Sequence, residues 1–499
     1  MAAGVALCAD LASHGIEPDA VRARLEAQGV PAAVFPGQCG RIPSAWSTGW
    51  DRTVVATCPG GPSGEEVRSR ARRTGADPAV GATSVDIVSA SAHGPPDRRI
   101  DRAALVLAAR VAGVWAAAPS PPEAFRMALQ TGKLSRRSLL AFGVGYVPVA
   151  TVGGVGCRGT SACGLCVDAC PVDAIDRSRA VPEVRVESCI GCGACVSACP
   201  VESATRLPGA DLAGFEAELA TLTGDAAASG VVFGCAGFLH ASEDRLPGTW
   251  FPVALPCLSI VTPAWALAAL AAGARAIAFR GCGGACRAGP AERLGAIVEF
   301  VREALSFAGV ADPGDRVRLL LTEDDDLPAA GPPPEELTPL GTGRFVLRLR
   351  EPAASASALR ALGVGSGSIA SPAAPFGRVA FDAGACTLCG LCADVCPTAA
   401  IRFDEGPVAA SLELDRSTCI GCDHCASICP EGALSVERGV DLDDLGAGAQ
   451  VLKRSVLARC RRCGDRVAPT AMLERLRPLL DPSVLATIEG LCQRCRGLR

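Results

Sequence analysis

Three stretches of the sequence space their cysteines in the way that a cluster-binding loop requires. Residues 189–200, 386–397 and 419–430 each read Cys-x2-Cys-x2-Cys-x3-Cys-Pro. Three closely spaced thiolates can bind three irons of one cubane, and the fourth cysteine, followed by proline, turns away to bind a neighbouring cluster. A zinc site or free thiols are the alternative, but a pair of such runs, with eight cysteines in this spacing, rarely serves either purpose. The spacing therefore predicts pairs of [4Fe–4S] clusters with crossed ligands.

The two later runs form one such pair. Crossing their fourth cysteines gives two predicted centres, Cys386, Cys389, Cys392 with Cys429, and Cys419, Cys422, Cys425 with Cys396. This arrangement resembles a bacterial ferredoxin with two clusters. We expect residues 376–438 to form a ferredoxin-like module, called here the second module.

The run at 189–200 has an irregular partner upstream. Cys163, Cys166 and Cys170 take the last three positions, but Thr160 stands at the first, and Cys157 lies three residues further upstream. A three-residue insertion would let Cys157 loop back to the cluster. The predicted centres of this first module, residues 151–206, are Cys157, Cys163, Cys166 with Cys199, and Cys189, Cys192, Cys195 with Cys170. The alternative to Cys157 as a ligand is a [3Fe–4S] centre with an open corner.

Between the modules, residues 228–325 alternate strand and helix patterns. Strands are expected at 231–233, 251–255, 276–279 and 316–321, and helices at 263–272 and 291–307. Thr262 is the expected N-cap of the first helix, with Pro263 at its first position and Gly273 at its end. Parallel sheets gather ligands at the carboxyl ends of their strands. Cysteines follow three of these strands and could hold a [2Fe–2S] cluster: Cys235, Cys257, Cys282 and Cys286. Buried, inert cysteines are the alternative.

Residues 1–118 repeat this pattern with fewer thiols. Strands at 5–7, 32–35 and 53–57 are followed by cysteines, and helices at about 18–28 and 64–74 connect them. The expected partial cluster site is Cys8, Cys39 and Cys58, one thiol short of a normal ligand set. Asp10 could add an oxygen, although cluster ligands are overwhelmingly thiolates.

The C-terminal residues 455–499 carry two further Cys-x2-Cys pairs around a helical stretch at 470–488. Cys460, Cys463, Cys492 and Cys495 suit tetrahedral zinc, which predicts a zinc-ribbon-like module. A further iron–sulfur cluster and unligated thiols are the alternatives. These assignments use all 27 cysteines.

Composition agrees with a multi-domain globular chain. It has 499 residues, of which 49% are hydrophobic. Its formal charge of −4 gives no sign of the basic surface that binds nucleic acid. The apolar stretch 257–274 contains a helix of only about ten residues. Such a helix is about 15 Å long, which is half the thickness of the hydrocarbon core of a membrane. We expect no membrane span, no signal peptide and a cytoplasmic location, where clustered thiols favour metal. Residues 119–150 and 326–375 are expected to be linkers, the second one flexible.

Two family resemblances follow from these residues. The segment GCAGF…LPCLSI…GARAIAFRGCGGAC resembles the delta iron–sulfur subunit of the hydrogenase that partners heterodisulfide reductase. It departs from that family at two places. Phe238 stands where the family has a second cysteine, and Arg287-Ala288 stand where it has His-Tyr after the final cysteine. The first 115 residues, with VVATCPGG, are similar to the N-terminal domain of the flavin-binding subunit of heterodisulfide reductase, although Cys8-Ala9-Asp10 lacks one thiol of that family's pattern. The first resemblance implies a [2Fe–2S] centre that relays electrons.

The sequence thus predicts a fold of class α/β plus α+β. It comprises two small parallel-sheet α/β domains, two ferredoxin-like modules with two clusters each, and the zinc-ribbon-like module. The predicted function is electron transfer within a larger cytosolic oxidoreductase whose partner subunits carry flavin or molybdenum. Two alternatives stay open: reduction of a disulfide substrate at an open-coordinate cluster, and an iron–sulfur sensor or assembly factor. No acid–base pair or nucleophile set is visible, so the chain itself is expected to be non-catalytic.

Overall fold

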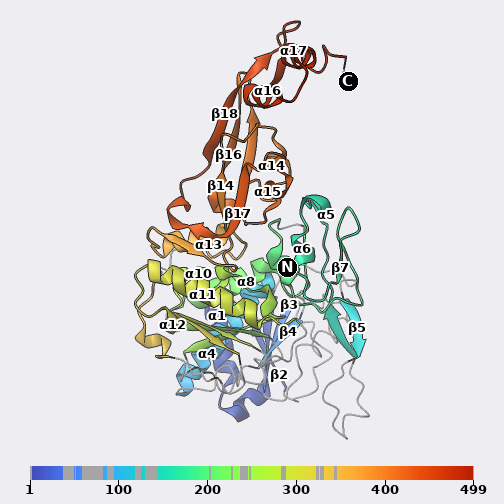
Figure 1. Ribbon diagram of the computed structural model, residues 1–499. Coiled ribbons are helices and arrows are strands. Elements are labelled where there is room, and N and C mark those ends of the chain that lie inside the picture. The colour runs from blue at the N-terminus through green and yellow to red at the C-terminus, as the bar shows by residue number, and fades with distance from the viewer. Residues whose placement is uncertain are drawn as a thin grey trace. The chain divides into compact units, whose positions relative to one another are not determined.

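The computed structural model of the chain describes residues 3–36, 50, 52–58, 82–86, 95–118, 125–129, 144–201, 204–225, 229–235, 246, 249–281, 288–321, 325, 327, 331–341 and 345–497. These residues fall into two compact units (Figure 1). Unit 1 comprises Met1–Cys157 and Gly164–Val364, and unit 2 comprises Arg158–Cys163 and Gly365–Arg499. Cys39, Cys282, Cys286 and the helix expected at about 64–74 lie outside the described residues.

The first sheet of unit 1 is parallel, with the strand order β2-β1-β3-β4. Its strands are β1 (Ala3–Cys8), β2 (Ala32–Phe35), β3 (Arg52–Thr57) and β4 (Ala82–Asp86). The helical segments that the structure describes beside them are η1 (Ala9–His14), α1 (Pro18–Ala27) and α4 (Pro96–Ala116). Apolar residues fill β1, and β3 is also largely buried although Arg52, Thr53 and Thr57 are polar.

The second sheet of unit 1 is also parallel, with the order β10-β9-β11-β12. Its strands are β9 (Gly230–Cys235), β10 (Trp250–Leu255), β11 (Ala276–Arg280) and β12 (Val317–Leu320). Its helical segments are α8 (Leu212–Thr223), η5 (Leu258–Ile260), α10 (Pro263–Ala272), α11 (Ala291–Phe307), α12 (Pro313–Arg316) and η6 (Pro334–Glu336). The helices predicted at 263–272 and 291–307 are confirmed. Every residue of α10 is buried, since all ten are apolar.

Helices α4 and α8 join the two sheets of unit 1, and neither is predicted by the sequence patterns above. Gly113 and Gly214 face each other where the helices cross. A Cβ at Gly113 would lie 3.0 Å from the Gly214 carbonyl oxygen, so the backbones approach closely. Beside them Arg110 pairs with the buried Glu218 at 3.0 Å. Arg102 of α4 donates to the carbonyl oxygen of Trp250 and lies over the Phe251 ring.

Both stretches expected to be linkers contain regular structure. Within 119–150, β5 (Phe125–Leu129) pairs antiparallel with β6 (Val144–Pro148). Within 326–375, helix α13 (Ala353–Ala361) packs against α10. The expectation that this second stretch is flexible was wrong for α13, because alanine is a strong helix former and Ala354, Ala356 and Ala358 are buried.

The first module contributes short elements to unit 1: α6 (Leu165–Asp168), β7 (Ile175–Asp176), β8 (Glu183–Val184) and α7 (Ala194–Ala198). The single turn α5 (Gly159–Ala162) belongs to unit 2. Among the residues that the structure describes, none of the helices combines the length and apolar character needed to cross a membrane.

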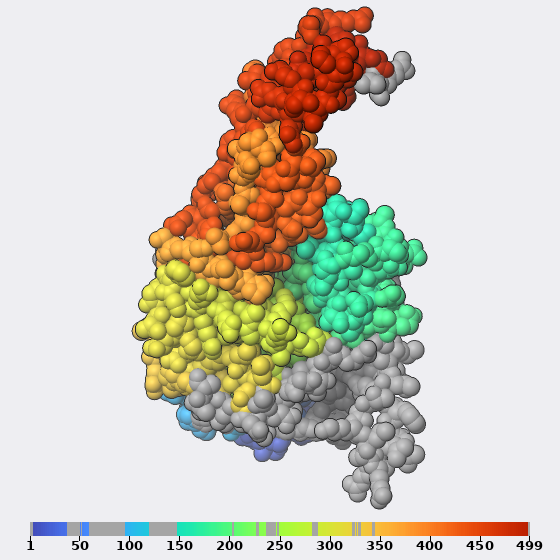
Figure 2. Space-filling model, viewed as in Figure 1, coloured from blue at the N-terminus to red at the C-terminus, as the bar shows by residue number. Residues whose placement is uncertain are grey.

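Unit 2 is built from two antiparallel sheets, β13-β17-β14 and β15-β16-β18-β19. The strands of the first sheet are β13 (Ser368–Ala370), β14 (Gly377–Phe381) and β17 (Leu434–Asp441). Those of the second are β15 (Ile401–Glu405), β16 (Ala409–Leu414), β18 (Gln450–Arg459) and β19 (Arg466–Pro469). The helical segments are α14 (Leu391–Asp394), η7 (Arg416–Thr418), α15 (His424–Ile428), η8 (Leu442–Asp444), α16 (Thr470–Leu476) and α17 (Pro482–Gly490). Residues from α16 onward form one end of unit 2 and are drawn in red (Figure 2).

Candidate metal centres

Each regular cysteine run folds into the same tight loop. The second residue after its first cysteine has a positive φ, and so does the residue after its second cysteine. These pairs are Gly191 and Gly193, Leu388 and Gly390, and Gly421 and Asp423. Glycine adopts this conformation freely, whereas Leu388 and Asp423 hold it against a steric cost of about 1–2 kcal/mol. The loop geometry is therefore maintained even where glycine is absent.

The first predicted centre of the second module surrounds a small cavity. Its lining includes Cys386, Cys389, Cys392 and Cys429. Apolar side chains complete the wall, among them Phe381, Leu388, Leu412 and Leu434. The structure thus brings three cysteines of one run together with the fourth cysteine of its partner run.

The second predicted centre of this module gathers around Cys396. Burial raises the pKa of Cys422 to about 11 and that of Cys425 to about 12, and the charge of Cys396 adds to both rises. Cys396 acts in the same direction on Cys419, whose pKa burial also raises. Cys396, which belongs to the earlier run, therefore lies beside the three leading cysteines of the later run.

In the first module, a small cavity is lined by Cys170, Cys189, Cys192 and Cys195. Burial raises the pKa of Cys192 to about 11 and raises that of Cys195 further. The other predicted set is divided, with Cys163 in unit 2 and Cys157, Cys166 and Cys199 in unit 1. That ligand set stays a prediction.

Backbone N–H groups point at the cysteine sulfurs of these sites. Ala174 donates to Cys170 Sγ at 3.2 Å, Leu388 to Cys386 Sγ at 3.4 Å and Ala433 to Cys429 Sγ at 3.3 Å. Such bonds stabilise thiolates and help to set cluster potentials. Four thiols, apolar walls and amides aimed at sulfur are the donor set that suits an iron–sulfur cluster, whose binding would deprotonate the thiols.

Two aspartates that are not among the predicted site residues accept hydrogen bonds just before the second module's runs. Asp382 Oδ1 accepts hydrogen bonds from the N–H groups of Gly384 and Ala385 at 2.8 and 3.2 Å. Asp415 Oδ1 accepts from the N–H and hydroxyl of Ser417 at 3.0 and 2.6 Å. Each aspartate stands four residues before the first cysteine of a run, and this repeated spacing was the available signal.

At the second parallel sheet, Cys235 ends β9 and Cys257 follows the neighbouring β10, with Cys282 and Cys286 outside the described residues. The Cys257 sulfur accepts from the N–H of Ser259 at 3.5 Å. The next turn, η5, contacts α7 of the first module, where a Cβ at Gly193 would lie 3.2 Å from Ile260. Cys257 is close enough that its charge contributes, after burial, to the raised pKa of Cys192.

At the first parallel sheet, Cys8 ends β1 and Cys58 directly follows the adjacent β3. Asp10 lies in η1, immediately beyond Cys8. The third cysteine of this expected site, Cys39, is outside the described residues. The two described thiols thus share the carboxyl edge of neighbouring strands, and the site stays a prediction.

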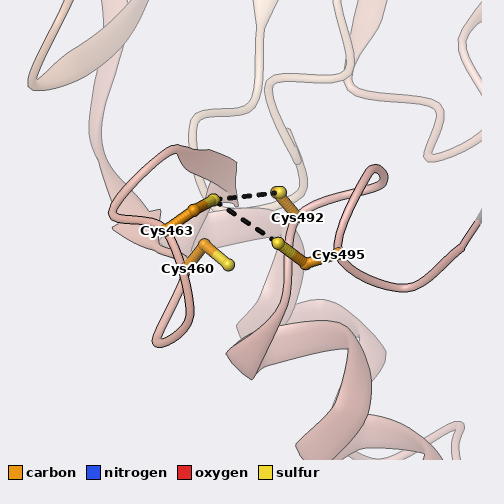
Figure 3. Close-up of side chains that lie close together, drawn as sticks. All are labelled: Cys460, Cys463, Cys492 and Cys495. Atoms are coloured by element: carbon orange, nitrogen blue, oxygen red, sulfur yellow. Dashed lines mark hydrogen bonds between the residues drawn. The ribbon is translucent and has the colours of Figure 1, made fainter.

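The C-terminal cysteines form the tightest group of ligands among the described residues. The sulfurs of Cys460, Cys463, Cys492 and Cys495 lie within 4.8 Å of one another (Figure 3). Cys463 Sγ is 3.6 Å from Cys492 Sγ and 3.5 Å from Cys495 Sγ. The N–H of Cys492 lowers the pKa of Cys460 to about 6, while hydrogen bonding with Cys463 raises the pKa of Cys495 to about 12. Four thiols this close together could hold one metal ion.

Comparison with known proteins identifies the two modules. The family model of the 4Fe-4S dicluster domain matches residues 157–203 and 385–433. No curated protein matches the chain. Two dicluster domains imply four [4Fe–4S] clusters and support an electron-transfer role. The matches include Cys157 and Thr160, so the irregular run lies within the first domain.

Proposed function

We propose that the protein is an electron-relay subunit of a larger cytosolic oxidoreductase of hydrogenase, formate dehydrogenase or heterodisulfide-reductase type. Bound iron–sulfur clusters supply one-electron transfer. The observation that carries the proposal is the crossed gathering of cysteines, in which three from one run and one from its partner run surround a single cavity. Crossing keeps the two centres of a module close together, as a relay requires.

The ligands of the four [4Fe–4S] centres are assigned as follows. They are Cys157, Cys163, Cys166 with Cys199; Cys189, Cys192, Cys195 with Cys170; Cys386, Cys389, Cys392 with Cys429; and Cys419, Cys422, Cys425 with Cys396. The chain's own part is to bury these thiols, to hold their loops and to direct N–H groups at their sulfurs. Burial and these hydrogen bonds are the means by which a protein sets cluster potentials.

The edge of the second parallel sheet is the proposed site of a further redox centre in the electron relay. The proximity of Cys257 to Cys192 supports exchange of electrons between this sheet's edge and the first module. A [2Fe–2S] cluster on Cys235, Cys257, Cys282 and Cys286 would agree with the resemblance to the hydrogenase delta subunit. The same resemblance supports partner subunits with flavin or molybdenum, on which substrate chemistry would occur.

Zinc is the proposed metal of the C-terminal quartet. A tetrahedral site with Zn–S bonds of about 2.3 Å places its sulfurs about 3.8 Å apart. The sulfur separations of 3.5 and 3.6 Å approach that value. Four thiolates around one small ion therefore fit the geometry, and the role of the metal would be structural.

Metal analysis of the anaerobically purified full chain tests the proposal. We expect about 18 iron atoms, sixteen from four cubanes and two from the central site, with one zinc, and EPR signals from several reduced clusters. A colourless, iron-free chain after reconstitution would overturn the proposal.

Affinity purification from the native host then tests the complex, where we expect a flavin- or molybdenum-containing protein in stoichiometric amount. Purification of the loaded chain alone would contradict its assignment to a larger complex.

A further inference from the structure

Lys453 is in direct contact with a cluster-binding loop. Its ammonium donates to the carbonyl oxygens of Ala383 and Cys386, both at 2.6 Å. It is the only lysine in the part of the chain that the structure describes, where arginine supplies the other long cationic side chains. A compact ammonium can bond two neighbouring carbonyls, whereas the planar fork of arginine suits paired oxygens of a different geometry.

An irregularity in strand β18 directs this side chain. Lys453 pairs with Leu412 of β16, but Val451 pairs with the next residue, Glu413, so Leu452 is an extra residue in the ladder. Such a bulge re-aims side chains on the bulged strand. Leu452 packs on the core around Cys392, Cys396 and Cys425, and Lys453 reaches the loop of Cys386. Two consecutive residues thereby serve the cluster-bearing part of the module.

The part of the chain that the structure describes offers Lys453 no ion-pair partner at the Cys386 loop. Glu431 lines the same cavity, but its carboxylate is paired with Arg475 at 2.8 Å. Among the described residues, no carboxylate pairs with Lys453. The ammonium lies 2.6 Å from the carbonyl oxygen of Cys386, so it places a positive charge beside this loop. A fixed positive charge there favours added negative charge at the site.

We propose that Lys453 is a positioning residue that raises the reduction potential of the centre held by Cys386, Cys389, Cys392 and Cys429. Reduction adds one negative charge to a bound cluster, and a fixed cation beside it stabilises the reduced form. The inference rests on the proposed ligand set of that centre. It adds one specific residue to the burial and hydrogen bonds that set cluster potentials in general.

An EPR-monitored redox titration of the full chain tests this role. K453M removes the charge at similar side-chain length, K453Q removes the charge but keeps a donor, and K453R keeps the charge. R454M is the matched control, because Arg454 is the exposed neighbour on the same strand. In K453M and K453Q we expect one of the four [4Fe–4S] transitions to move to lower potential. The expected change is on the order of tenfold in the equilibrium constant, which is about 59 mV for one electron. K453R and R454M should keep the wild-type transitions.

Each outcome decides the inference. An unshifted set of transitions in iron-replete K453M overturns it, and so does an equal shift in K453R or in R454M. Loss of the centre in both neutral variants would assign Lys453 a purely structural role and also overturn it. Iron content separates these results from the proposed function, since missing iron in the wild-type chain refutes the ligand set itself.

Discussion

The carboxylate of Glu351 caps helix α10 by accepting a hydrogen bond from the N–H of Ala264 at 2.8 Å. The same Oε1 atom accepts from the Ser355 hydroxyl at 2.7 Å, while Oε2 is buried without a hydrogen-bond partner. Thr262 is the N-cap residue, but its side chain makes no capping bond. A carboxylate 87 residues away therefore replaces the local cap that the sequence predicts.

Replacing Glu351 with glutamine is expected to change how stability depends on pH. Burial raises the pKa of Glu351 from 4.5 to about 7. The folded chain thus holds this proton more tightly than the unfolded chain. Its stabilising contribution is full below pH 4.5 and is lost as the pH rises through 7, by roughly 3 kcal/mol. E351Q should lack that loss. Unfolding of both chains at pH 5.5, 6.5 and 7.5 tests this, and parallel pH profiles would contradict it.

Exchange of Cys396 for alanine should remove the centre of the later run, not that of its own run. The reason is that Cys396 lies beside Cys419, Cys422 and Cys425. We expect the loss of up to four irons or conversion to a [3Fe–4S] signal, with the centre of Cys386 retained. C429A is the matched control, which should spare the Cys419 centre. EPR of both variants in the K453M background identifies which transition survives, and identical losses would contradict crossing.

Gly377 is expected to tolerate no side chain. A Cβ there would lie 2.5 Å from Gly421 Cα and 3.0 Å from Cys419 Sγ. G377A should therefore displace the loop of the later run and reduce iron content by up to four per chain. G295A is the control, since a Cβ at Gly295 in α11 meets nothing within 4 Å and alanine favours helices by about 0.5–1 kcal/mol. Full iron content and an unchanged melting temperature in G377A would refute the prediction.

Exchange of Cys463 for serine should release the metal of the C-terminal quartet without affecting iron. Cys463 contacts two of the other sulfurs, so its loss breaks the ligand set. We expect zinc to fall from one per chain to near zero, with iron unchanged. Cobalt substitution of the wild-type quartet should give the absorption of a tetrahedral tetrathiolate. Iron in the quartet, or zinc retained by C463S, would be the contrary result.

Sequence patterns predicted most elements of both parallel sheets. Helix α10 was located correctly because Pro263 and Gly273 mark its ends and its body is uniformly apolar. Helices α4 and α8 were missed because their recognition depends on packing between Gly113 and Gly214, which are 101 residues apart. Helix α13 was mistaken for a linker because Ala354, Ala356 and Ala358 belong to a helix that packs on α10, a distant part of the sequence.

In the candidate sites too, features set by neighbouring residues could be predicted from the sequence, and features set by distant residues could not. Spacing within 12 residues was sufficient to propose crossed ligands, because the loop geometry is local. The role of Lys453 could not be predicted, since it depends on an extra residue at Leu452 and on a loop 67 residues away. The cap by Glu351 depends in the same way on a distant carboxylate.

Strand β18 connects two chemical environments through one uninterrupted backbone. Its bulge lies beside the Cys386 loop, and its last residue, Arg459, precedes the first thiol of the quartet. Deuterium uptake along its amides can therefore be followed from one end to the other after a chelator strips the quartet. Faster uptake as far as Lys453 would mean that the metal of the C-terminal quartet helps to hold Lys453 against the Cys386 loop.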